Sequence, residues 1–237
     1  MSDIVLINFL ISLVDVKKDK IIDWSILAIG LLVQVVVFVL MPDNPWSLVS
    51  GLFGMCSVIL CSQGNILTFL FGFGQIFTYT YLCYLERFYA GIAMNVFYFV
   101  TQIYGVFAWR KRLKTSEDRT TEVTIITRRL SMPVLLVVSV ASLVVSSLIG
   151  WILSIYTADG SPYLDAFTTV PALVAQVLMM LAYREQWYLW LFVDVLSCMM
   201  WLLAGNYCMT ALYAFWCLNC IFGYIRWTKQ LEVQPES

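Results

Sequence analysis

Residues 85–111 read LERFYAGIAMNVFYFVTQIYGVFAWRK, and residues 203–229 read LAGNYCMTALYAFWCLNCIFGYIRWTK. The two stretches lie 118 positions apart, and eight of their 27 aligned positions are identical without a gap. The identities include the ending Gly-x3-Trp-x-Lys, which Gly105, Trp109 and Lys111 form in the first stretch. Each stretch is largely apolar over about 20 residues, the length that crosses a bilayer as a helix. The chain is therefore predicted to be all-α, with an internal repeat of membrane-spanning helices.

The composition of the chain indicates an integral membrane protein. Of its 237 residues, 61% are hydrophobic and 12% are charged, whereas a soluble domain is about 25% charged. The formal net charge of −1 gives no basic surface for nucleic acid. There is no histidine, and the seven cysteines, most of them within apolar runs, lack zinc-ligand spacing. We therefore expect no metal and no cofactor.

Eight apolar runs are long enough to span a bilayer as helices. The connections between them are short except for residues 110–132. The predicted spans are residues 25–41, 46–62, 66–84, 89–109, 133–156, 165–183, 187–203 and 207–227.

Lysine and arginine are distributed unequally between the two ends of these spans. With eight spans, thirteen of the fourteen lie on one side, and only Arg87 lies on the other. Cytoplasmic loops carry the excess of Lys and Arg, so both termini are predicted to be cytoplasmic. The basic loop at residues 110–132 is interpreted as a solvated determinant of orientation that contacts anionic lipid, in preference to a regulatory segment.

The internal repeat sets the predicted domain organisation. It pairs the fourth span with the eighth, so the two three-helix units are residues 46–109 and 165–229. Two such units have the same orientation only if an odd number of helices joins them. Residues 110–164, which comprise the basic loop and one linker helix, supply that helix. Residues 1–45 add an N-terminal segment with an extra helix, and residues 230–237 form a cytoplasmic tail. Parallel repeats are typical of transporters that hold their substrate near the bilayer midplane.

Asp194 is the only carboxylate near the middle of a long apolar run. A charge at the centre of a bilayer costs on the order of 3 kcal/mol on insertion scales, so such residues usually face a cavity or a partner. Trp190 and Ser197 share its helical face, at spacings of four and three residues. We expect Asp194 to contact a substrate. The alternative is that it only pairs with an amide or tyrosine of a neighbouring helix.

Further candidates are amide and aromatic residues near the middle of the spans. Unpaired amides are costly in hydrocarbon, so their side chains should point inward. Gln102 and Asn219 are equally well explained as hydrogen-bond partners between helices, and Trp190 and Trp216 as packing residues. The complete expected substrate-binding set is Asp194, Trp190, Ser197, Trp216, Asn219, Gln102, Tyr98, Asn95, Gln75 and Phe215.

Three tryptophans, Trp109, Trp187 and Trp227, stand at the ends of spans. Because Trp is enriched at membrane–water interfaces, interface anchoring is their expected role. Gly72 and Gly74 lie within the third span, where glycine allows close approach of helices or a hinge.

These residues suit a flat, polar and weakly cationic solute. Aromatic faces stack a ring and attract a cation, amides bind an amide or sugar hydroxyls, and one carboxylate balances one positive charge. No lysine or arginine lies near the middle of a span, which disfavours a phosphorylated substrate.

Three segments resemble those of the PnuC family of nicotinamide riboside transporters. They are residues 102–111 (QIYGVFAWRK), 185–194 (EQWYLWLFVD) and 207–229. The resemblance extends from about residue 46 to residue 229, nearly the whole membrane region. It implies a SWEET-like fold of two three-helix bundles and a linker helix, assembled as a homotrimer in the bacterial inner membrane.

The function that the resemblance implies is facilitated diffusion of nicotinamide riboside, a vitamin B3 precursor used in NAD biosynthesis. This uniport would proceed by alternating access and become net inward through phosphorylation inside the cell. Thiamine, another aromatic cation, is the close alternative substrate. A membrane-embedded enzyme or a sensor subunit is the alternative of a different class, but the chain shows no paired acid and base or nucleophile pattern.

Overall fold

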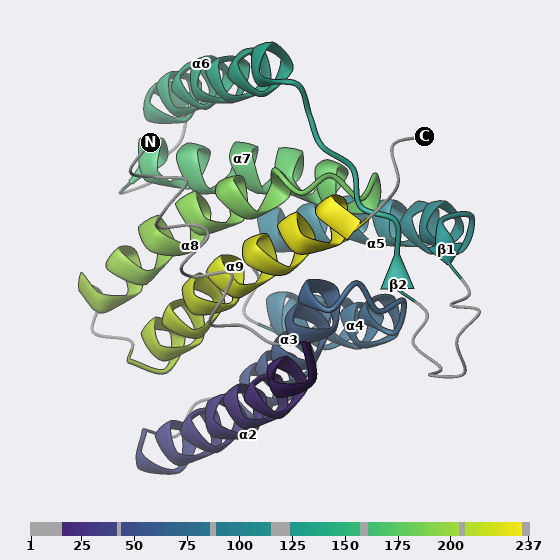
Figure 1. The fold of residues 1–237 in the computed structure, drawn as a ribbon. Helices are drawn as coiled ribbons and strands as arrows, with labels where there is room; N and C mark the ends of the chain where they lie inside the picture. The colour runs from purple at the N-terminus through teal and green to yellow at the C-terminus, as the bar shows by residue number, and fades with distance from the viewer. Residues whose placement is uncertain are drawn as a thin grey trace.

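The computed structural model describes residues 16–41, 44–85, 89–114, 124–156, 161–203 and 207–233. Within these residues the chain forms eight long helices and one short hairpin (Figure 1). The predicted cytoplasmic location of the two termini concerns residues 1–15 and 234–237, which lie outside the described residues. The helices are α2 (Val16–Leu40), α3 (Pro45–Ser62), α4 (Thr68–Leu85), α5 (Tyr89–Arg110), α6 (Met132–Tyr156), α7 (Pro162–Met180), α8 (Gln186–Leu203) and α9 (Tyr207–Val233).

All eight predicted spans coincide with helices of the structure, so the all-helical prediction is confirmed. Among the described helices, four are long and apolar enough to cross a membrane: Pro45–Ser62, Ile92–Arg110, Met132–Tyr156 and Pro162–Met180. Two shorter apolar helices, Trp24–Leu40 and Gln186–Met200, accompany them. The helix α7 lies three residues earlier than its predicted span at both ends, and the largest differences are two extensions, because α2 begins at Val16 and α9 continues to Val233. Both extensions are rich in good helix formers such as Lys, Gln, Leu and Glu.

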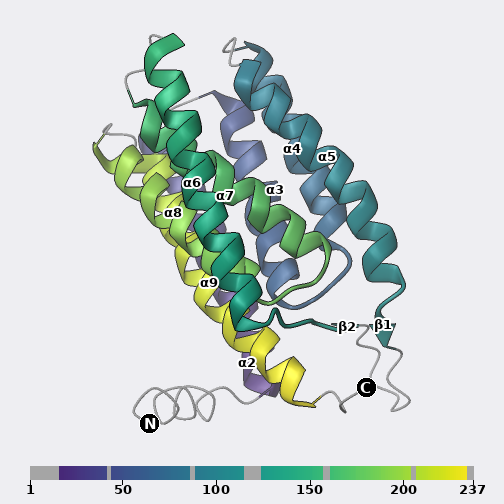
Figure 2. The ribbon, with the colours of Figure 1, turned by 90° about the horizontal axis from the view of Figure 1, so that it is seen from above.

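The helices run alternately in opposite directions and form two groups of three. One group is α3, α4 and α5, and the other is α7, α8 and α9; they meet where α3 packs on α9 and α5 packs on α7. The helix α6 packs on α7 at one edge of the molecule, while α2 packs on α3 and α9 (Figures 1 and 2). Figure 2 shows the hairpin, β1 (Leu113–Lys114) and β2 (Thr124–Ile125), at the same end as the last turns of α5 and α9.

We call this end of the molecule the basic end. Every lysine and arginine whose side chain the structure describes lies there. These residues are Arg110, Lys111, Arg112, Arg128, Arg129, Arg184, Arg226 and Lys229.

The turns that follow α3 and α7 have matching backbone geometry, 118 residues apart. The N–H of Gly64 donates to the carbonyl of Cys61 at 2.9 Å, and the N–H of Ala182 donates to the carbonyl of Met179 at 2.9 Å. Gly64 has φ of 69° and Ala182 has φ of 59°. Both residues occupy the left-handed region, which costs an L-residue free energy but not glycine. The offset seen in the sequence of α5 and α9 therefore extends to the local structure of a different pair of segments.

The two helix groups are joined at the basic end by a pair of indole hydrogen bonds. Trp109 Nε1 donates to the carbonyl of Met179 at 3.1 Å, from α5 to α7. Trp227 Nε1 donates to the carbonyl of Cys61 at 3.2 Å, from α9 to α3. The two donors are 118 residues apart, and so are the two acceptors. In each case the third helix of one group bonds to the end of the first helix of the other.

The predicted anchoring of Trp109, Trp187 and Trp227 at the membrane interface is wrong. Trp109 and Trp227 are 0% exposed and Trp187 is 3% exposed. The rings of Trp187 and Trp227 meet edge to face, with centroids 5.7 Å apart, and Trp187 lies against Gly223, where a Cβ would come within 2.5 Å of its ring. The three rings are buried because the opposite helix group supplies carbonyl acceptors for two of them and glycine leaves room for the third.

Residues 126–131 cross the basic end, and we call them the strap. Its Arg128 donates its N–H to the carbonyl of Ala182 at 2.7 Å and accepts from the N–H of Arg184 at 2.9 Å. Thr127 is 2% exposed, and its hydroxyl donates to the carbonyl of Trp227 at 3.4 Å. Arg128 and Arg129 of the strap are exposed, as expected of a solvated basic loop, but its backbone and Thr127 are bonded to the bundle. Residues 115–123 lie outside the described part. The strap thus donates to the carbonyl of Ala182 in the turn after α7 and to that of Trp227 within α9.

Charged side chains also fasten the strap. The carboxylate of Glu185 accepts from the N–H of Leu130 at 3.0 Å and pairs with Arg184 at 3.1 Å. The guanidinium of Arg112 donates to the carbonyl of Leu181, in the turn between α7 and α8. Burial, and then the neighbouring Arg128, lower the pKa of Arg112 from its ordinary value. Glu185 thus fixes the strap at the start of α8, and Arg112, whose carbonyl accepts the N–H of Ile126, fixes it to the turn after α7.

Candidate functional site

The interior of the bundle contains polar side chains from six helices. Groups buried in a membrane protein must be paired or must face a cavity or ligand, so their positions define where a solute could bind. The buried residues of this kind include Ser57 on α3, Thr68 on α4, Asn95, Thr101 and Gln102 on α5, Gln176 on α7, Asp194 and Ser197 on α8, and Asn219 on α9.

Asp194 is the central charged group of this interior. It is 3% exposed, and the thiol of Cys220 on α9 donates to its Oδ2 at 3.4 Å. A thiol is a weak donor and carries no compensating charge. Ser197, one turn further along α8, is buried as well, whereas Trp190, one turn before, is half-buried. The predicted face of α8 is therefore directed inward around its carboxylate.

One tyrosine, Tyr98 on α5, lies near Asp194, and two further tyrosines lie near Tyr98. The hydroxyl of Tyr98 on α5 is within electrostatic range of Asp194 and of the hydroxyls of Tyr79 on α4 and Tyr213 on α9. The ring of Tyr213 meets the ring of Trp216 edge to face, with centroids 5.0 Å apart. Asp194 on α8 and Tyr98 on α5 thus approach each other from different helix groups.

Several polar atoms in this interior are buried and have no hydrogen-bond partner among the described residues. They are Asn95 Nδ2, Gln102 Oε1, Trp216 Nε1 and Asn219 Oδ1. All four residues belong to the set expected from the sequence. The other end of the Asn219 amide is used, because its Nδ2 donates to the carbonyl of Val58 at 3.3 Å. An unpartnered buried group costs about 1–3 kcal/mol, so a ligand that satisfies it gains affinity.

Asn219 also takes part in a second pair of matching contacts between the helix groups. Gln176 on α7 donates its Nε2 to Thr101 Oγ1 on α5 at 3.2 Å. Thr101 lies 118 residues before Asn219, and Val58 lies 118 residues before Gln176. The amide is therefore on the third helix in one group and on the first helix in the other.

Two expected residues lie elsewhere. Phe215 packs against α2, where its ring would be 2.5 Å from a Cβ at Gly30, and it belongs to an apolar cluster with Leu27 and Ile59. Phe215 therefore leaves the candidate set. Gln75 is half-buried and packs against Gly54 of α3 within its own helix group.

Sequence reasoning did not select two residues of the site, Tyr213 and Cys220. The repeat contained a signal for both, because Tyr213 aligns with Asn95 and Cys220 aligns with Gln102 at the offset of 118. Because Asn95 and Gln102 both belong to the expected set, the alignment could have added Tyr213 and Cys220 to that set. In the part of the chain that the structure describes, no group of three His, Cys, Asp or Glu side chains could hold a metal ion.

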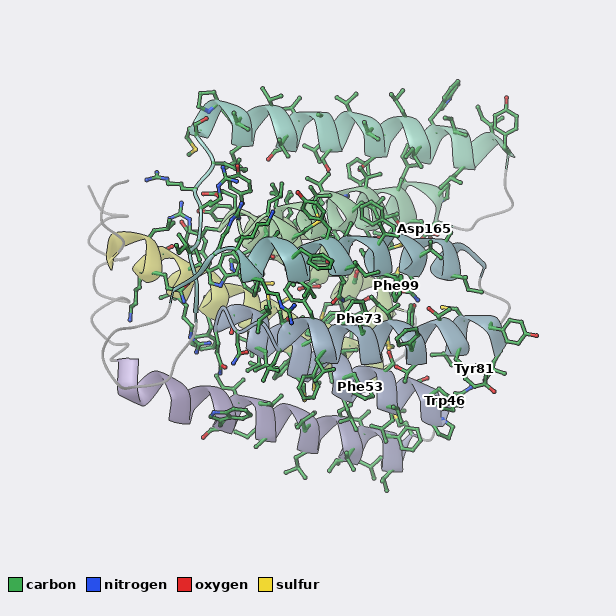
Figure 3. The ribbon with its side chains drawn as sticks, turned by 90° about the vertical axis from the view of Figure 1, so that its right-hand side faces the viewer. Trp46, Phe53, Phe73, Tyr81, Phe99 and Asp165 are labelled. Carbon is green, nitrogen blue, oxygen red and sulfur yellow. The ribbon has the colours of Figure 1, made fainter. Side chains whose placement is uncertain are left out.

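An aromatic groove on the outer surface is distinct from this interior. Its volume is about 260 Å³, and Trp46, Phe77, Thr78 and Tyr81 line it. Phe77 and Tyr81 are exposed, and Figure 3 shows Trp46 and Tyr81 at one end of the bundle, away from the basic end. Exposed rings near a helix end are typical of residues that face lipid headgroups.

An apolar bundle that encloses polar groups with unsatisfied donors and acceptors is the arrangement of a solute transporter. The profile of the family described as "Nicotinamide mononucleotide transporter" matches residues 44–229. The chain belongs to this family of transporters, which are not enzymes, and the expected membership is confirmed.

Individual relatives are similar over nearly their whole length. The chain is 34% identical over 217 residues to the nicotinamide riboside transporter PnuC of Neisseria mucosa, covering 88% of this chain and 81% of that protein. It is 30% identical over 209 residues to the protein of the same name in Haemophilus influenzae, covering 87% and 89%. A solved structure described as the crystal structure of the vitamin B3 transporter PnuC superposes with a TM-score of 0.76 at 32% identity, covering 89% of this chain and 92% of that chain.

Proposed function

We propose that the protein carries nicotinamide riboside across the bacterial inner membrane by facilitated diffusion. The observation that carries this proposal is the buried Asp194 carboxylate near Tyr98, in an interior that also contains the unpartnered amide groups of Asn95 and Gln102. They complement a flat pyridinium cation that bears an amide and sugar hydroxyls. The names of the relatives that are 30–34% identical support this substrate.

The riboside is a better substrate than the mononucleotide that gives the family its description. The two molecules differ by one phosphate group. Within the described residues, every lysine and arginine side chain lies at the basic end, whereas Asp194 is in the interior. A phosphate at the site would meet a carboxylate and no guanidinium to pair with.

The fold proposed for transport has eight membrane spans and parallel repeats of the SWEET-like kind. The repeats are α3–α5 and α7–α9, with α6 as the linker and α2 as an addition, and three copies associate. An axis along the membrane normal would exchange the α3–α9 contact with the α5–α7 contact. The paired bonds of Trp109 and Trp227 support this relation, while the homotrimer rests on the resemblance.

We place the basic end, and with it both termini, in the cytoplasm, because Lys and Arg are enriched there. The bonds of Trp109 to Met179 and of Trp227 to Cys61 connect the two repeats at this end. They must break before a solute can leave toward the cytoplasm. Alternating access then consists of opening one end of the repeat interface while the other is closed.

Uniport is proposed rather than ion coupling. The chain has no histidine, and Asp194 is the only carboxylate placed in the middle of a described helix of the two groups. A fixed carboxylate can balance the charge of the substrate without carrying a second ion. Thiamine is the second candidate substrate, since the same aromatic and acidic groups fit any aromatic cation.

Calorimetry of the purified protein against nicotinamide riboside, the mononucleotide and thiamine tests the substrate. We expect saturable binding of the riboside and none of the mononucleotide. Equal affinity for the riboside and the mononucleotide would contradict the proposal. Tighter binding of thiamine would make thiamine the proposed substrate instead.

The counter-ion role of Asp194 is tested separately with Asp194→Asn. Losing a charge-assisted contact of about 1.5–3 kcal/mol weakens binding by about ten-fold or more. Asp165→Asn, the same change in the first turn of α7, is the control and should bind as the wild type does. If Asp194→Asn binds equally tightly, Asp194 is not the counter-ion, even where the riboside remains the substrate.

A further inference from the structure

Gln102 is held in a place that only a glycine on the facing helix leaves open. A Cβ at Gly72 on α4 would lie 2.4 Å from Gln102 Nε2 and 2.6 Å from its Oε1. Both residues are buried. Atoms cannot approach that closely, so any side chain at residue 72 would displace the carboxamide rather than the more rigid helix backbone.

The oxygen of this carboxamide is unused. Gln102 Oε1 is buried and has no hydrogen-bond partner in the described part of the chain. A carbonyl oxygen accepts up to two hydrogen bonds, and an interior acceptor without one is a place where a ligand donor is favoured. The position of the oxygen therefore matters for binding as well as for packing.

The second helix group shows that close packing does not itself require glycine here. At the offset of 118, Gly72 corresponds to Trp190, and Gln102 corresponds to Cys220. The large side chain is on α8 and the small one on α9, which reverses the arrangement of α4 and α5. Cys220 then donates to Asp194. One group presents an amide and the other presents a ring beside a carboxylate.

We propose that Gly72 is a positioning residue for substrate binding: by lacking a side chain, it sets the carboxamide of Gln102 so that Oε1 accepts a hydrogen bond from the transported solute. This inference rests on the proposed transport function and assigns one residue outside the expected site. Gly72 contacts Gln102, and it affects the solute only through that amide.

A double-mutant cycle of Gly72→Ala and Gln102→Ala tests this, with the dissociation constant for nicotinamide riboside measured by calorimetry. We expect each single variant to weaken binding by about ten-fold, the loss of one hydrogen bond. The double variant should bind no more weakly than Gln102→Ala alone, because the amide through which Gly72 acts is already absent. Effects that add would contradict the proposal, as would unchanged binding by Gly72→Ala.

A second pair of variants separates positioning from general damage. In Gly72→Ala with Gln102→Asn, the amide is one methylene shorter and has room beside the new methyl group, so part of the lost affinity should return. Gly105→Ala is the matched control, because its Cβ would come within 2.6 Å of the Phe69 ring and not of Gln102. Gly105→Ala should lower the melting temperature, and its effect should be the same with and without Gln102→Ala.

The melting temperature of the ligand-free protein gives a readout that does not depend on the substrate. Gly72→Ala should lower it in the wild-type background and much less in Gln102→Ala, where the clash is absent. Equal lowering in both backgrounds would overturn the assignment. If the wild type does not bind the riboside, the proposed function is wrong. The double-mutant cycle can then still test the role of Gly72, with the melting temperature or the binding of thiamine as its readout.

Discussion

Glu185 illustrates how single residues of the basic end depend on one another. It is 1% exposed, pairs with Arg184 at 3.1 Å and accepts from the N–H of Leu130 in the strap at 3.0 Å. Arg184 is buried too, and its guanidinium lies 4.9 Å from the centroid of the Tyr224 ring. A buried ion pair adds little net stability, but removing one member leaves an uncompensated charge.

We expect Glu185→Gln to destabilise the protein by about 3 kcal/mol, since the charge of Arg184 then stays buried without a counter-charge. The melting temperature of the detergent-purified protein measures this. The double variant Arg184→Met with Glu185→Gln is the control and should recover part of the loss, because no isolated charge remains. An unchanged melting temperature in Glu185→Gln would show that water reaches Arg184.

At the scale of elements, the paired tryptophans connect α5 to the end of α7 and α9 to the end of α3. Each indole donates to a carbonyl at a helix end that also accepts an N–H from the turn that follows the helix. Replacing the indole by a phenyl ring keeps most of the packing and removes the donor. The two rings also contact each other, with centroids 6.0 Å apart, so exchange is followed at both turns in each variant.

We expect Trp109→Phe to increase hydrogen exchange in the turn after α7, and Trp227→Phe to increase it in the turn after α3. A lost hydrogen bond of about 1 kcal/mol corresponds to a roughly five-fold change in local opening. Exchange followed by mass spectrometry on peptides from the two turns measures this. Equal increases in both turns for either variant would mean that the two connections open together.

The helices could be predicted from the sequence because a membrane span needs a long apolar run, and the repeat identified which spans correspond. Asn95, Gln102 and Asp194 could also be predicted to face inward, since exposing them to lipid is costly. Phe215 could not be placed, because an apolar ring faces lipid, helix or ligand at similar cost. The burial of Trp109 was missed for a related reason. Its acceptor, the carbonyl of Met179, lies 70 residues away, and nothing local distinguishes a buried tryptophan at a helix end from one at the interface.

At the scale of the whole molecule, the proposed uniport of a cation would respond to the membrane potential. Moving one positive charge through 100 mV changes its free energy by about 2.3 kcal/mol, which is a concentration ratio of about 50. Proteoliposomes with a potassium diffusion potential of about 100 mV, negative inside, should therefore accumulate nicotinamide riboside about 50-fold without a proton or sodium gradient.

Radioactive riboside trapped in the vesicles measures this uptake, and vesicles without the protein are the control. Accumulation that requires a proton gradient would replace uniport by coupled transport. Accumulation that is independent of the membrane potential would mean that a compensating charge, such as that of the Asp194 side chain, moves together with the substrate.

The strap also has a consequence for how the protein is made. Thr127 is synthesised 100 residues before Trp227, whose carbonyl accepts its hydroxyl. The ribosome therefore releases the middle of the chain long before its final neighbour exists. Until α9 has been inserted, the strap lacks this contact and the α3 end lacks the indole of Trp227. A truncated nascent chain would leave both surfaces uncovered, so the last helix completes the basic end of the bundle.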